Sequence, residues 1–589
     1  MTVDAASYRA TASIMGKAGG LAYRYGPSSA EYGTTGNAGI PSYYKRADTA
    51  FVSDRNGGIR PCYPPYCGTW QVGNYDNDTN PGGFSSNWGH IAFTPDSPSQ
   101  RIGVSDLAIS SVSNNAFSQK PELSWTLGGG GLDEFLAVKV KDEGKDASNP
   151  VAIARCYRPG WCMSSVMVFQ SGLVAIAGSN TAQNYASAQL AAGKVPTAVA
   201  VSSGGEFAFI TVWDTTNLRG EVAVVALAGI CGYCSISNPA EYDFWGEWSG
   251  LYPGLPNMGN VGYMKVLGYA PLPADMKAPT EISVTTGVSR SDYLNENGNE
   301  KAYNLPLSNA ANRASFAQGG RNFDRYAKAG IAVVISKSEQ RVAFVDLKPL
   351  FQYYQSMYFG TASNFNVTTT IGSGDSQWPR TFASAPQQTP TVIKTVNLAS
   401  RPTAVKAYLW GANKRAWVGT QDGQLHIFNL GDYPTAGTGS AASIVEVGSV
   451  AVGRNPTSIA YPKEKSRYPD ITNEVIVTSR GDRKIDWVRF SGSGGSIVRT
   501  LQDQRLQDPI AAEDTENNGT DSAVLSVADF NGKQLHNYRY GPVIMYAYSI
   551  SCQPPNGCGM GASGNDPFEY GGSFPFPGTP FQVTSANIP

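Results

Sequence analysis

Charged residues are scarce in this chain. Asp, Glu, Lys and Arg together make up 15% of its 589 residues, against about a quarter in an average globular protein. The 45 basic and 46 acidic residues nearly balance, and no basic stretch is longer than a few residues. A surface that binds phosphate or nucleic acid therefore has little support. No apolar run reaches the roughly 18 residues of a membrane span, so we expect no transmembrane helix.

Histidine and the familiar catalytic motifs are equally scarce. The only histidines are His90, His426 and His536, each far from any cysteine, which argues against a histidine-rich metal centre. The chain has no G-x-S-x-G, no Walker A loop and no H-E-x-x-H. Paired carboxylates could still perform acid–base catalysis, because the acidic residues are spread over many loops. The sequence thus leaves enzymatic activity open and favours a non-catalytic role.

A recognisable signal peptide is also missing, since the first twenty residues lack basic and apolar regions. Two expectations remain, a cytosolic protein or the mature form of an exported one, and the cysteines favour the second. All eight lie in close pairs across turns: Cys62 and Cys67, Cys156 and Cys162, Cys231 and Cys234, Cys552 and Cys558.

Four local disulfides fit this pattern, with a zinc pair or free thiols as the alternatives. Only Cys231 and Cys234 have the spacing of a zinc knuckle. Disulfides persist in oxidising compartments. We therefore expect a location outside the cell, on the cell surface or in the periplasm.

Glycine (65) and proline (37) are abundant, and a phrase built around them repeats along the chain. Each copy has Pro-Thr or a variant, an alternating strand, a turn and further strands. Five prolines open these copies: Pro196, Pro279, Pro402, Pro456 and Pro509. The last intervals are roughly 50 residues, about the length of a four-stranded propeller blade. Residues 90–109 and 135–178 look like two further, degenerate copies.

The stretch VPTAVAVSSGGEFAFITVWDTTNLRGEVAVVAL, which starts at Val195, resembles the YVTN/surface-protein and lactonase-like seven-bladed β-propeller repeats. The match covers about residues 190–230 and 395–540 and lacks the signature Thr-Asn. The resemblance implies an all-β fold, a single β-propeller of about seven four-stranded blades with loop insertions. We place the propeller at residues 80–545, after an irregular N-terminal extension (1–79) and before a Gly/Pro/Phe-rich C-terminal tail (546–589).

One loop has the ligand spacing of a calcium site. Asp514, Glu516, Asn518 and Asp521 place oxygen-bearing side chains around Gly519, and calcium selects such hard oxygen ligands. The loop departs from the usual pattern in its Glu and in lacking a bidentate Glu at the twelfth position. A solvated Asn/Gly turn is the alternative. Ca²⁺ is the only cofactor that the sequence suggests.

Two aromatic groups are candidate binding surfaces. Trp245, Trp248 and Tyr252 follow the Cys231–Cys234 pair and could stack on sugars or anchor a partner, or form a small core under a long insertion. In the tail, Phe574 and Phe576 could lie along a neighbouring copy, or the tail could wrap over its own propeller.

The favoured function is a non-catalytic extracellular or cell-surface propeller. It would bind a protein or glycan, or assemble as the subunit of a surface layer, filament or complex. The alternative is a metal-assisted propeller enzyme such as a lactonase-like hydrolase.

Overall fold

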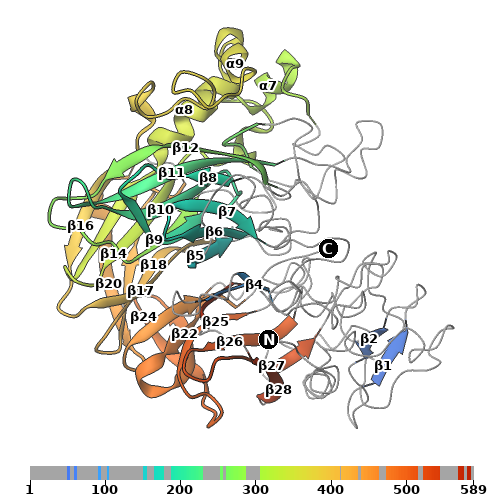
Figure 1. The fold of residues 1–589 in the computed structure, drawn as a ribbon, viewed down its shortest axis with the longest axis vertical. Helices are drawn as coiled ribbons and strands as arrows, with labels where there is room; N and C mark the ends of the chain where they lie inside the picture. The colour runs from blue at the N-terminus through green and yellow to red at the C-terminus, as the bar shows by residue number, and fades with distance from the viewer. Residues whose placement is uncertain are drawn as a thin grey trace.

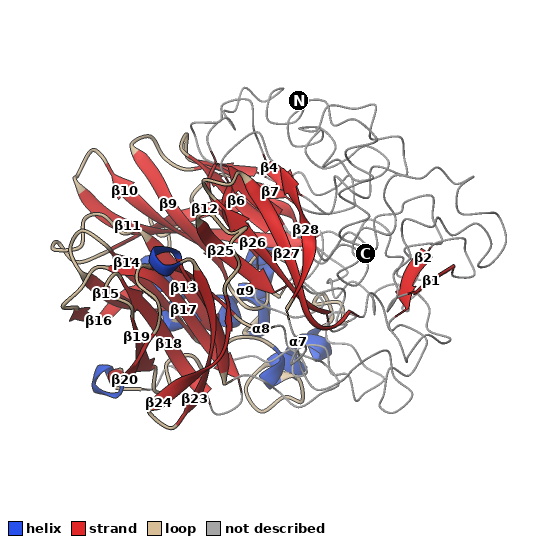
Figure 2. Ribbon diagram, turned by 90° about the horizontal axis from the view of Figure 1, so that it is seen from below, coloured by secondary structure: helices blue, strands red, loops and turns tan. Residues whose placement is uncertain are grey.

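The computed structural model describes part of the chain, and every structural statement below concerns that part. The described ranges are 50–53, 59–62, 90–93, 102–104, 150–155, 165–177, 187–229, 252–256, 261–286, 305–410, 413–435, 439–462, 473–514, 522–543, 568–575 and 580–584. Strands dominate these ranges and helices are few (Figures 1 and 2).

Six four-stranded antiparallel sheets and one three-stranded sheet form the blades of a propeller. Blade 1 holds β5 (Pro150–Arg155), β6 (Ser165–Phe169), β7 (Leu173–Ala177) and β8 (Ser187–Gln189). Blade 2 holds β9 (Lys194–Val201), β10 (Phe207–Asp214), β11 (Arg219–Gly229) and β12 (Val261–Pro271). Blade 3 holds β13 (Glu281–Thr286), β14 (Gly330–Ser336), β15 (Arg341–Asp346) and β16 (Thr391–Asn397).

Blade 4 holds β17 (Pro402–Trp410), β18 (Asn413–Thr420), β19 (Gln424–Asn429) and β20 (Val445–Ala451). Blade 5 holds β21 (Pro456–Ala460), β22 (Glu474–Ser479), β23 (Lys484–Ser491) and β24 (Gly494–Leu501). Blade 6 holds β25 (Pro509–Asp514), β26 (Ser522–Asp529), β27 (Gln534–Val543) and β28 (Glu569–Pro575). Blade 7 holds β29 (Pro580–Thr584), β3 (His90–Phe93) and β4 (Ile102–Val104), and a separate hairpin pairs β1 (Ala50–Ser53) with β2 (Ile59–Cys62).

The seven innermost strands form a closed ring. Contacts join β5 to β9, and so on through β13, β17, β21 and β25 to β29, which contacts β5 again. In blade 7 the C-terminal strand β29 pairs antiparallel with the N-terminal strand β3, so the two ends of the chain close the ring together. The structure thus confirms the predicted all-β propeller of about seven blades.

The C-terminal boundary differs from the prediction. The sequence placed residues 546–589 outside the propeller, yet β28 is the fourth strand of blade 6 and β29 the innermost strand of blade 7. A Gly- and Pro-rich segment hides these strands from pattern analysis, because few alternating apolar residues remain in it. Pro580 suits its position as the first residue of β29. The innermost strand of a blade is an edge strand, and its first residue needs no N–H for the ladder.

Most of the core lies between neighbouring blades. The strands read as continuous apolar runs because both faces of each sheet are covered: every residue of β14 is buried, as is nearly all of β10. Separate hydrophobic clusters fill the spaces between consecutive blades from blade 1 to blade 6.

Helices occur in connections rather than in blades. They are α7 (Ala310–Phe316), α8 (Lys348–Phe359) and α9 (Ala362–Thr368), with short 3-10 turns η8 (Phe323–Arg325), η9 (Pro386–Gln388), η10 (Ala441–Ser443) and η11 (Arg480–Asp482). Figure 1 shows α7, α8 and α9 grouped at the top of the view, above β12.

Candidate functional site

The connections divide the propeller into two unlike faces. Because neighbouring strands are antiparallel, successive connections alternate between the faces. The second-to-third-strand turns (170–172, 215–218, 337–340, 421–423, 480–483 and 530–533) and the links between blades define the short-turn face. The first-to-second and third-to-fourth connections define the insertion face. Four long connections of blades 2, 3 and 6 belong to the insertion face: 230–260, 287–329, 347–390 and 544–568.

Most candidates from the sequence fall in connections of the insertion face. Asp514 is the last residue of β25, and the connection that follows it returns to β26. The segments that carry Cys156 with Cys162, Cys231 with Cys234, and Cys552 with Cys558 join β5 to β6, β11 to β12, and β27 to β28. These candidates therefore belong to connections that start and end on one face.

Several of these residues lie outside the described part of the chain: Glu516, Asn518, Asp521, Trp245, Trp248, Phe576, Cys67 and the cysteines of the other three pairs. Cys62 ends β2, where it is the register partner of Ala50. Phe574 lies in β28 opposite Leu535. The calcium loop and the disulfides accordingly stay predictions.

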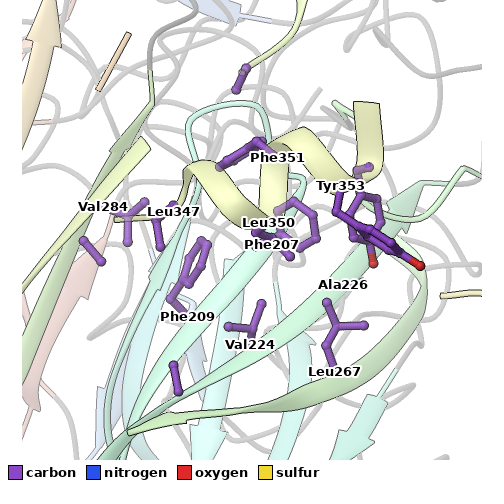
Figure 3. Close-up of a cluster of buried hydrophobic side chains, with 14 of the residues drawn as sticks. Phe207, Phe209, Val224, Ala226, Leu267, Val284, Leu347, Leu350, Phe351 and Tyr353 are labelled. Carbon is purple, nitrogen blue, oxygen red and sulfur yellow. The ribbon is translucent and has the colours of Figure 1, made fainter. Parts of the chain in front are cut away.

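Tyr252 belongs to a packed aromatic unit on the insertion face. Residues 252–256, 305–329 and 347–390, here the aromatic cap, pack on blades 2 and 3 in one hydrophobic cluster. Figure 3 shows Leu350, Phe351 and Tyr353 of α8 beside Phe207 of β10. The ring of Phe207 meets Phe351 edge-on at 5.4 Å and Tyr354 at 4.9 Å. The cap is thus joined to the propeller core.

Hydrogen bonds fix the cap further. Trp378 donates its Nε1–H to Tyr358 Oη at 2.8 Å, and Tyr358 donates to the Pro253 carbonyl at 2.9 Å. Tyr252 is half-buried, meets Tyr358 edge-on and accepts the Leu307 N–H at 3.3 Å. Burial raises the pKa of Tyr252. These contacts are those of a core residue beneath an insertion.

A buried lysine holds one loop of the cap in place. The Lys265 ammonium, on β12, donates to three carbonyl oxygens: Gly372 at 2.8 Å, Gly374 at 2.9 Å and Gln377 at 3.1 Å. Burial lowers the pKa of Lys265, and Asp375 acts in the opposite direction. The three carbonyls use all three donors of the ammonium group, so Lys265 pins this loop to blade 2.

A central channel runs between the innermost strands. It has a volume of about 320 Å³, and residues of β5, β9, β13, β17, β21, β25 and β29 all line it. Such a volume lies at the lower end of the range for small-molecule sites.

Side chains in the channel wall bind the backbone of the next blade. Thr457 donates its hydroxyl to the Ile510 carbonyl at 2.7 Å. Ser283 accepts the Ala407 N–H at 2.9 Å, and Gln582 Oε1 accepts the Ile153 N–H at 2.9 Å. An innermost strand has a ladder partner on one side only, so these side chains satisfy backbone groups that would otherwise lack a partner.

The same wall carries ionisable groups. Burial raises the pKa of Glu281 to about 8, although Lys406, an N–H bond from Val405 and Lys337 each oppose the shift. The Lys406 ammonium lies 5.2 Å from the centre of the Tyr461 ring, and Glu513 also lines the channel. A carboxyl group whose pKa is raised like that of Glu281 is a common feature of functional sites.

These wall residues were not among the candidates predicted from the sequence, although the sequence carries a usable signal. A proline is the first residue of five of the seven innermost strands and the third residue of β9. The ladder shifts register directly after each of these prolines: Pro150, Pro196, Pro402, Pro456, Pro509 and Pro580. In blade 3, Pro279 precedes the strand. The residues that line the channel fall mostly within five positions after these prolines, and Glu281 and Lys406 are among them.

The described histidine side chains have structural partners. His426 Nδ1 lies 2.7 Å from Glu446 Oε1, and buried His536 lies 3.4 Å from Asp529. Within the described ranges, no group of three or more His, Cys, Asp or Glu side chains is placed to hold a metal ion. The helices in these ranges include none long and apolar enough to cross a membrane.

Neither a protein-family model nor a curated protein matches this chain. Solved structures do match. A functionally unknown protein from Desulfotomaculum acetoxidans shares 10% identity at a TM-score of 0.35, covering 72% of this chain and 90% of that one. The Cps50 (Swd1) β-propeller domain of Myceliophteria thermophila shares 8% identity at a TM-score of 0.34, covering 66% and 84%. A periplasmic gluconolactonase of Pseudomonas aeruginosa, PpgL, shares 12% identity at a TM-score of 0.37, covering 75% and 89%.

Proposed function

We propose that this protein is a non-catalytic, exported β-propeller of the YVTN/surface-protein type, which binds a protein, a glycan or another subunit through its insertion face. The observation that carries the proposal is the sidedness of the connections. Four long connections of blades 2, 3 and 6 leave from one face, and the described parts of those on blades 2 and 3 fold into the aromatic cap. Loops on a rigid scaffold are where propellers and similar folds place their binding residues.

A matched pair of double variants tests which face binds. Ala314→Arg with Ala362→Arg changes exposed positions of the cap, and Gln502→Arg with Gln504→Arg changes exposed positions of the short-turn face. We expect sedimentation velocity and a glycan array to show association or glycan binding by the wild type. The cap variant should lose it and the short-turn variant should keep it. A wild type that neither associates nor binds a glycan sinks the proposal, as does loss in the short-turn variant alone.

The second candidate function is a metal-assisted hydrolase of the lactonase-like kind. Two carboxylates, Glu281 and Glu513, line the channel and favour this candidate to that extent. Hydrolysis of a simple lactone is measured with and without added Ca²⁺ or Mn²⁺. If the wild type hydrolyses the lactone and Glu281→Gln does not, the enzymatic function is supported in place of the binding function.

Export rests on the cysteine pairs, which we propose are four intramolecular disulfides: Cys62–Cys67, Cys156–Cys162, Cys231–Cys234 and Cys552–Cys558. Each would close a short loop and hold its shape. Mass spectrometry of a non-reduced digest should find each pair in one linked peptide. Free thiols at most of these positions would instead indicate a cytosolic protein.

We also propose that Asp514, Glu516, Asn518 and Asp521 bind Ca²⁺ in the connection between β25 and β26. Binding to the folded chain alone raises its melting temperature by mass action. EDTA should therefore lower the melting temperature and added Ca²⁺ should restore it. If Asp514→Ala responds to Ca²⁺ like the wild type, the loop is a plain turn.

A further inference from the structure

The short-turn face carries charged groups that binding at the insertion face does not use. On blades 4 to 6, neighbouring turns and links form what is here called the basic arc. It comprises residues 398–401, 420–423, 452–455, 480–484, 502–508 and 529–533. These ranges contain seven basic and five acidic residues, whereas the whole chain has a net charge of −1. The arc is therefore a positively charged part of a nearly neutral protein.

Hydrogen bonds make the arc continuous across blades 4 and 5. The Gln421 N–H donates to the Arg401 carbonyl at 2.8 Å, and the Asn455 N–H donates to the Gln421 carbonyl at 2.9 Å. The Arg480 N–H donates to the Asn455 carbonyl at 3.0 Å. The Arg480 guanidinium binds both oxygens of Asp508, at 2.6 and 2.7 Å. Each turn is thus tied to the link beside it.

The arc continues onto blade 6 through two acidic residues. The Phe530 N–H donates to the Asp508 carbonyl at 2.9 Å, and the Asp508 N–H donates to Asp529 Oδ1 at 2.9 Å. Asp508 and Asp529 are both buried. Their carboxylates therefore hold turns together and present little surface to a ligand.

The other acidic side chains of the arc are engaged as well. Asp482 accepts the backbone N–H and the Nε–H of Arg454, both at 2.8 Å. Asp503 accepts the backbone N–H of Arg505 at 2.9 Å and its guanidinium at 2.6 Å. Asp422, the one exposed acidic residue of the arc, accepts a hydroxyl of its own turn at 2.6 Å. Every carboxylate of the arc thus has a partner within the arc.

Three basic side chains of the arc have no such partner. Arg401, Arg483 and Lys533 are exposed. Within the described part of the chain, their side chains form no hydrogen bond or ion pair. The Arg454 side chain, although paired with Asp482, is still 73% exposed. The exposed charged side chains without a partner are therefore all cations, one for each of blades 4, 5 and 6.

Uncharged amides accompany these cations. The amide side chains that are exposed on the arc are Gln421, Gln502, Gln504, Gln507 and Asn531. A primary amide both donates and accepts hydrogen bonds, as the hydroxyl groups of a sugar do. The surface of the arc can therefore pair with anionic groups and with hydroxyl groups together.

Aromatic and large apolar side chains are scarce on the surface of the arc. The exposed large hydrophobic residues of the described chain all lie outside it. Phe530 is half-buried, and the Arg480 guanidinium lies 5.0 Å from its ring centre. Stacking on nucleic acid bases and insertion into a lipid surface therefore lack the residues that they need.

We propose that the basic arc binds an acidic polysaccharide. The carboxylate or sulfate groups of the polymer pair with Arg401, Arg483 and Lys533, and its hydroxyl groups bond to the amides between them. Arginine suits this role because its planar fork matches a carboxylate or sulfate with two parallel hydrogen bonds. The arc is a second surface, and its binding does not depend on the function proposed for the insertion face.

Fluorescence anisotropy on the full-length protein tests the proposal with labelled polygalacturonate and labelled dextran sulfate, which separate carboxylate from sulfate. Neutral dextran, a single-stranded DNA oligonucleotide and vesicles of phosphatidylcholine with phosphatidylglycerol are the comparisons. We expect at least one acidic polysaccharide to bind, and to bind more weakly as salt rises, because exposed charges are screened. The proposal is overturned if neither binds, if dextran binds as well, or if the oligonucleotide or the vesicles bind more tightly.

Variants locate the site. Arg401→Gln with Arg483→Gln removes two exposed charges without breaking a described contact, so the melting temperature should be kept. Its affinity for the acidic polysaccharide should fall at least about fivefold. Lys533→Gln alone should weaken binding by a smaller factor. Lys328→Gln with Lys414→Gln removes the same charge from the insertion face, and this matched control should bind like the wild type. An equal loss in the control, or unchanged binding by the arc variant, overturns the proposal.

The two binding functions fail independently. Ala314→Arg with Ala362→Arg, the cap variant, should bind the acidic polysaccharide like the wild type. Gln502→Arg with Gln504→Arg adds charge to the arc and should bind it at least as tightly. Insertion-face association should be unchanged in Arg401→Gln with Arg483→Gln. Loss of polysaccharide binding in the cap variant alone would move the site to the insertion face and overturn the assignment to the arc.

Discussion

The two faces of this propeller stabilise their connections by different physical means. On the short-turn face, turns are held by polar side chains. Asp529 accepts the N–H groups of Gln507, Asp508 and Gly532 at 2.7 to 2.9 Å. On the insertion face, the cap is held by aromatic packing, with Trp378 and Tyr358 fully buried. A short turn can be satisfied by one carboxylate, whereas a long insertion must bury an apolar core of its own to stay ordered.

Both faces depend on the closure of the ring of blades. We therefore expect the largest effect from a change that opens the ring. Truncation after Pro575 removes β29, the innermost strand of blade 7, and leaves β3 paired with β4 alone. We expect the truncated protein to lose its cooperative thermal transition or to aggregate, as followed by circular dichroism and light scattering. Truncation after Thr584 keeps β29 and should melt like the wild type. A Pro575 truncation with an unchanged transition would mean that β29 does not close the ring.

We expect the next largest loss of stability from a substitution in the aromatic cap. Trp378→Ala removes a fully buried ring that contacts Tyr353, Tyr354 and Tyr358. Such substitutions cost about 3–5 kcal/mol of unfolding free energy. Because the cap shares a cluster with β10 and β11, urea denaturation should stay a single transition at lower midpoint. A separate early transition would show instead that the cap folds independently of blades 2 and 3.

Asp529→Ala tests the polar strategy of the short-turn face. The change orphans backbone donors at a buried turn, and we expect a loss of about 2–3 kcal/mol in urea denaturation. Burial alone would raise the pKa of Asp529, but hydrogen bonds from His536 and three N–H groups outweigh it and hold that pKa below its ordinary value.

The depressed pKa gives Asp529 a pH signature. Its stabilisation is present above the unfolded pKa and is lost as pH falls through the folded one. The difference between wild type and Asp529→Ala should therefore shrink in acid. An undiminished difference at low pH would contradict the charge-based account of this turn.

Glu281, the first residue of the innermost strand β13, predicts the smallest effect and the opposite pH dependence. Its pKa of about 8 in the folded protein exceeds the ordinary 4.5, so folding is favoured by its proton. This stabilisation is complete below about pH 4.5 and is lost as pH rises through about 8. The melting temperature of the wild type should fall relative to Glu281→Gln by a few degrees between about pH 6 and pH 9. Parallel curves would mean that the pKa of Glu281 is not raised in the folded protein.

Much of the fold could be predicted from local patterns. The repeated phrase built around proline found five of the innermost strands, because in each copy a proline at or near the start of the strand is followed by an alternating run. Pro150 and Pro580 were not counted among these prolines, although residues 135–178 were expected to hold a degenerate copy. Tyr252 could be read in two ways from the sequence, and the contacts with Tyr358 and Leu307 place it in a core.

The amino-acid sequence by itself determined the class of fold and its repeat, since strand periodicity, turn residues and proline spacing are local properties of the chain. It also determined which residue types make up the candidate calcium loop, the cysteine pairs and the two aromatic groups. Only the tertiary structure decided that β29 joins β3 across most of the chain, and that Glu281, Lys406 and Glu513 line one channel. Both depend on how seven sheets close into a ring, and closure relates residues that no local pattern connects. The sidedness of the insertions has the same origin, because a connection acquires a face only when its two strands are placed in the ring.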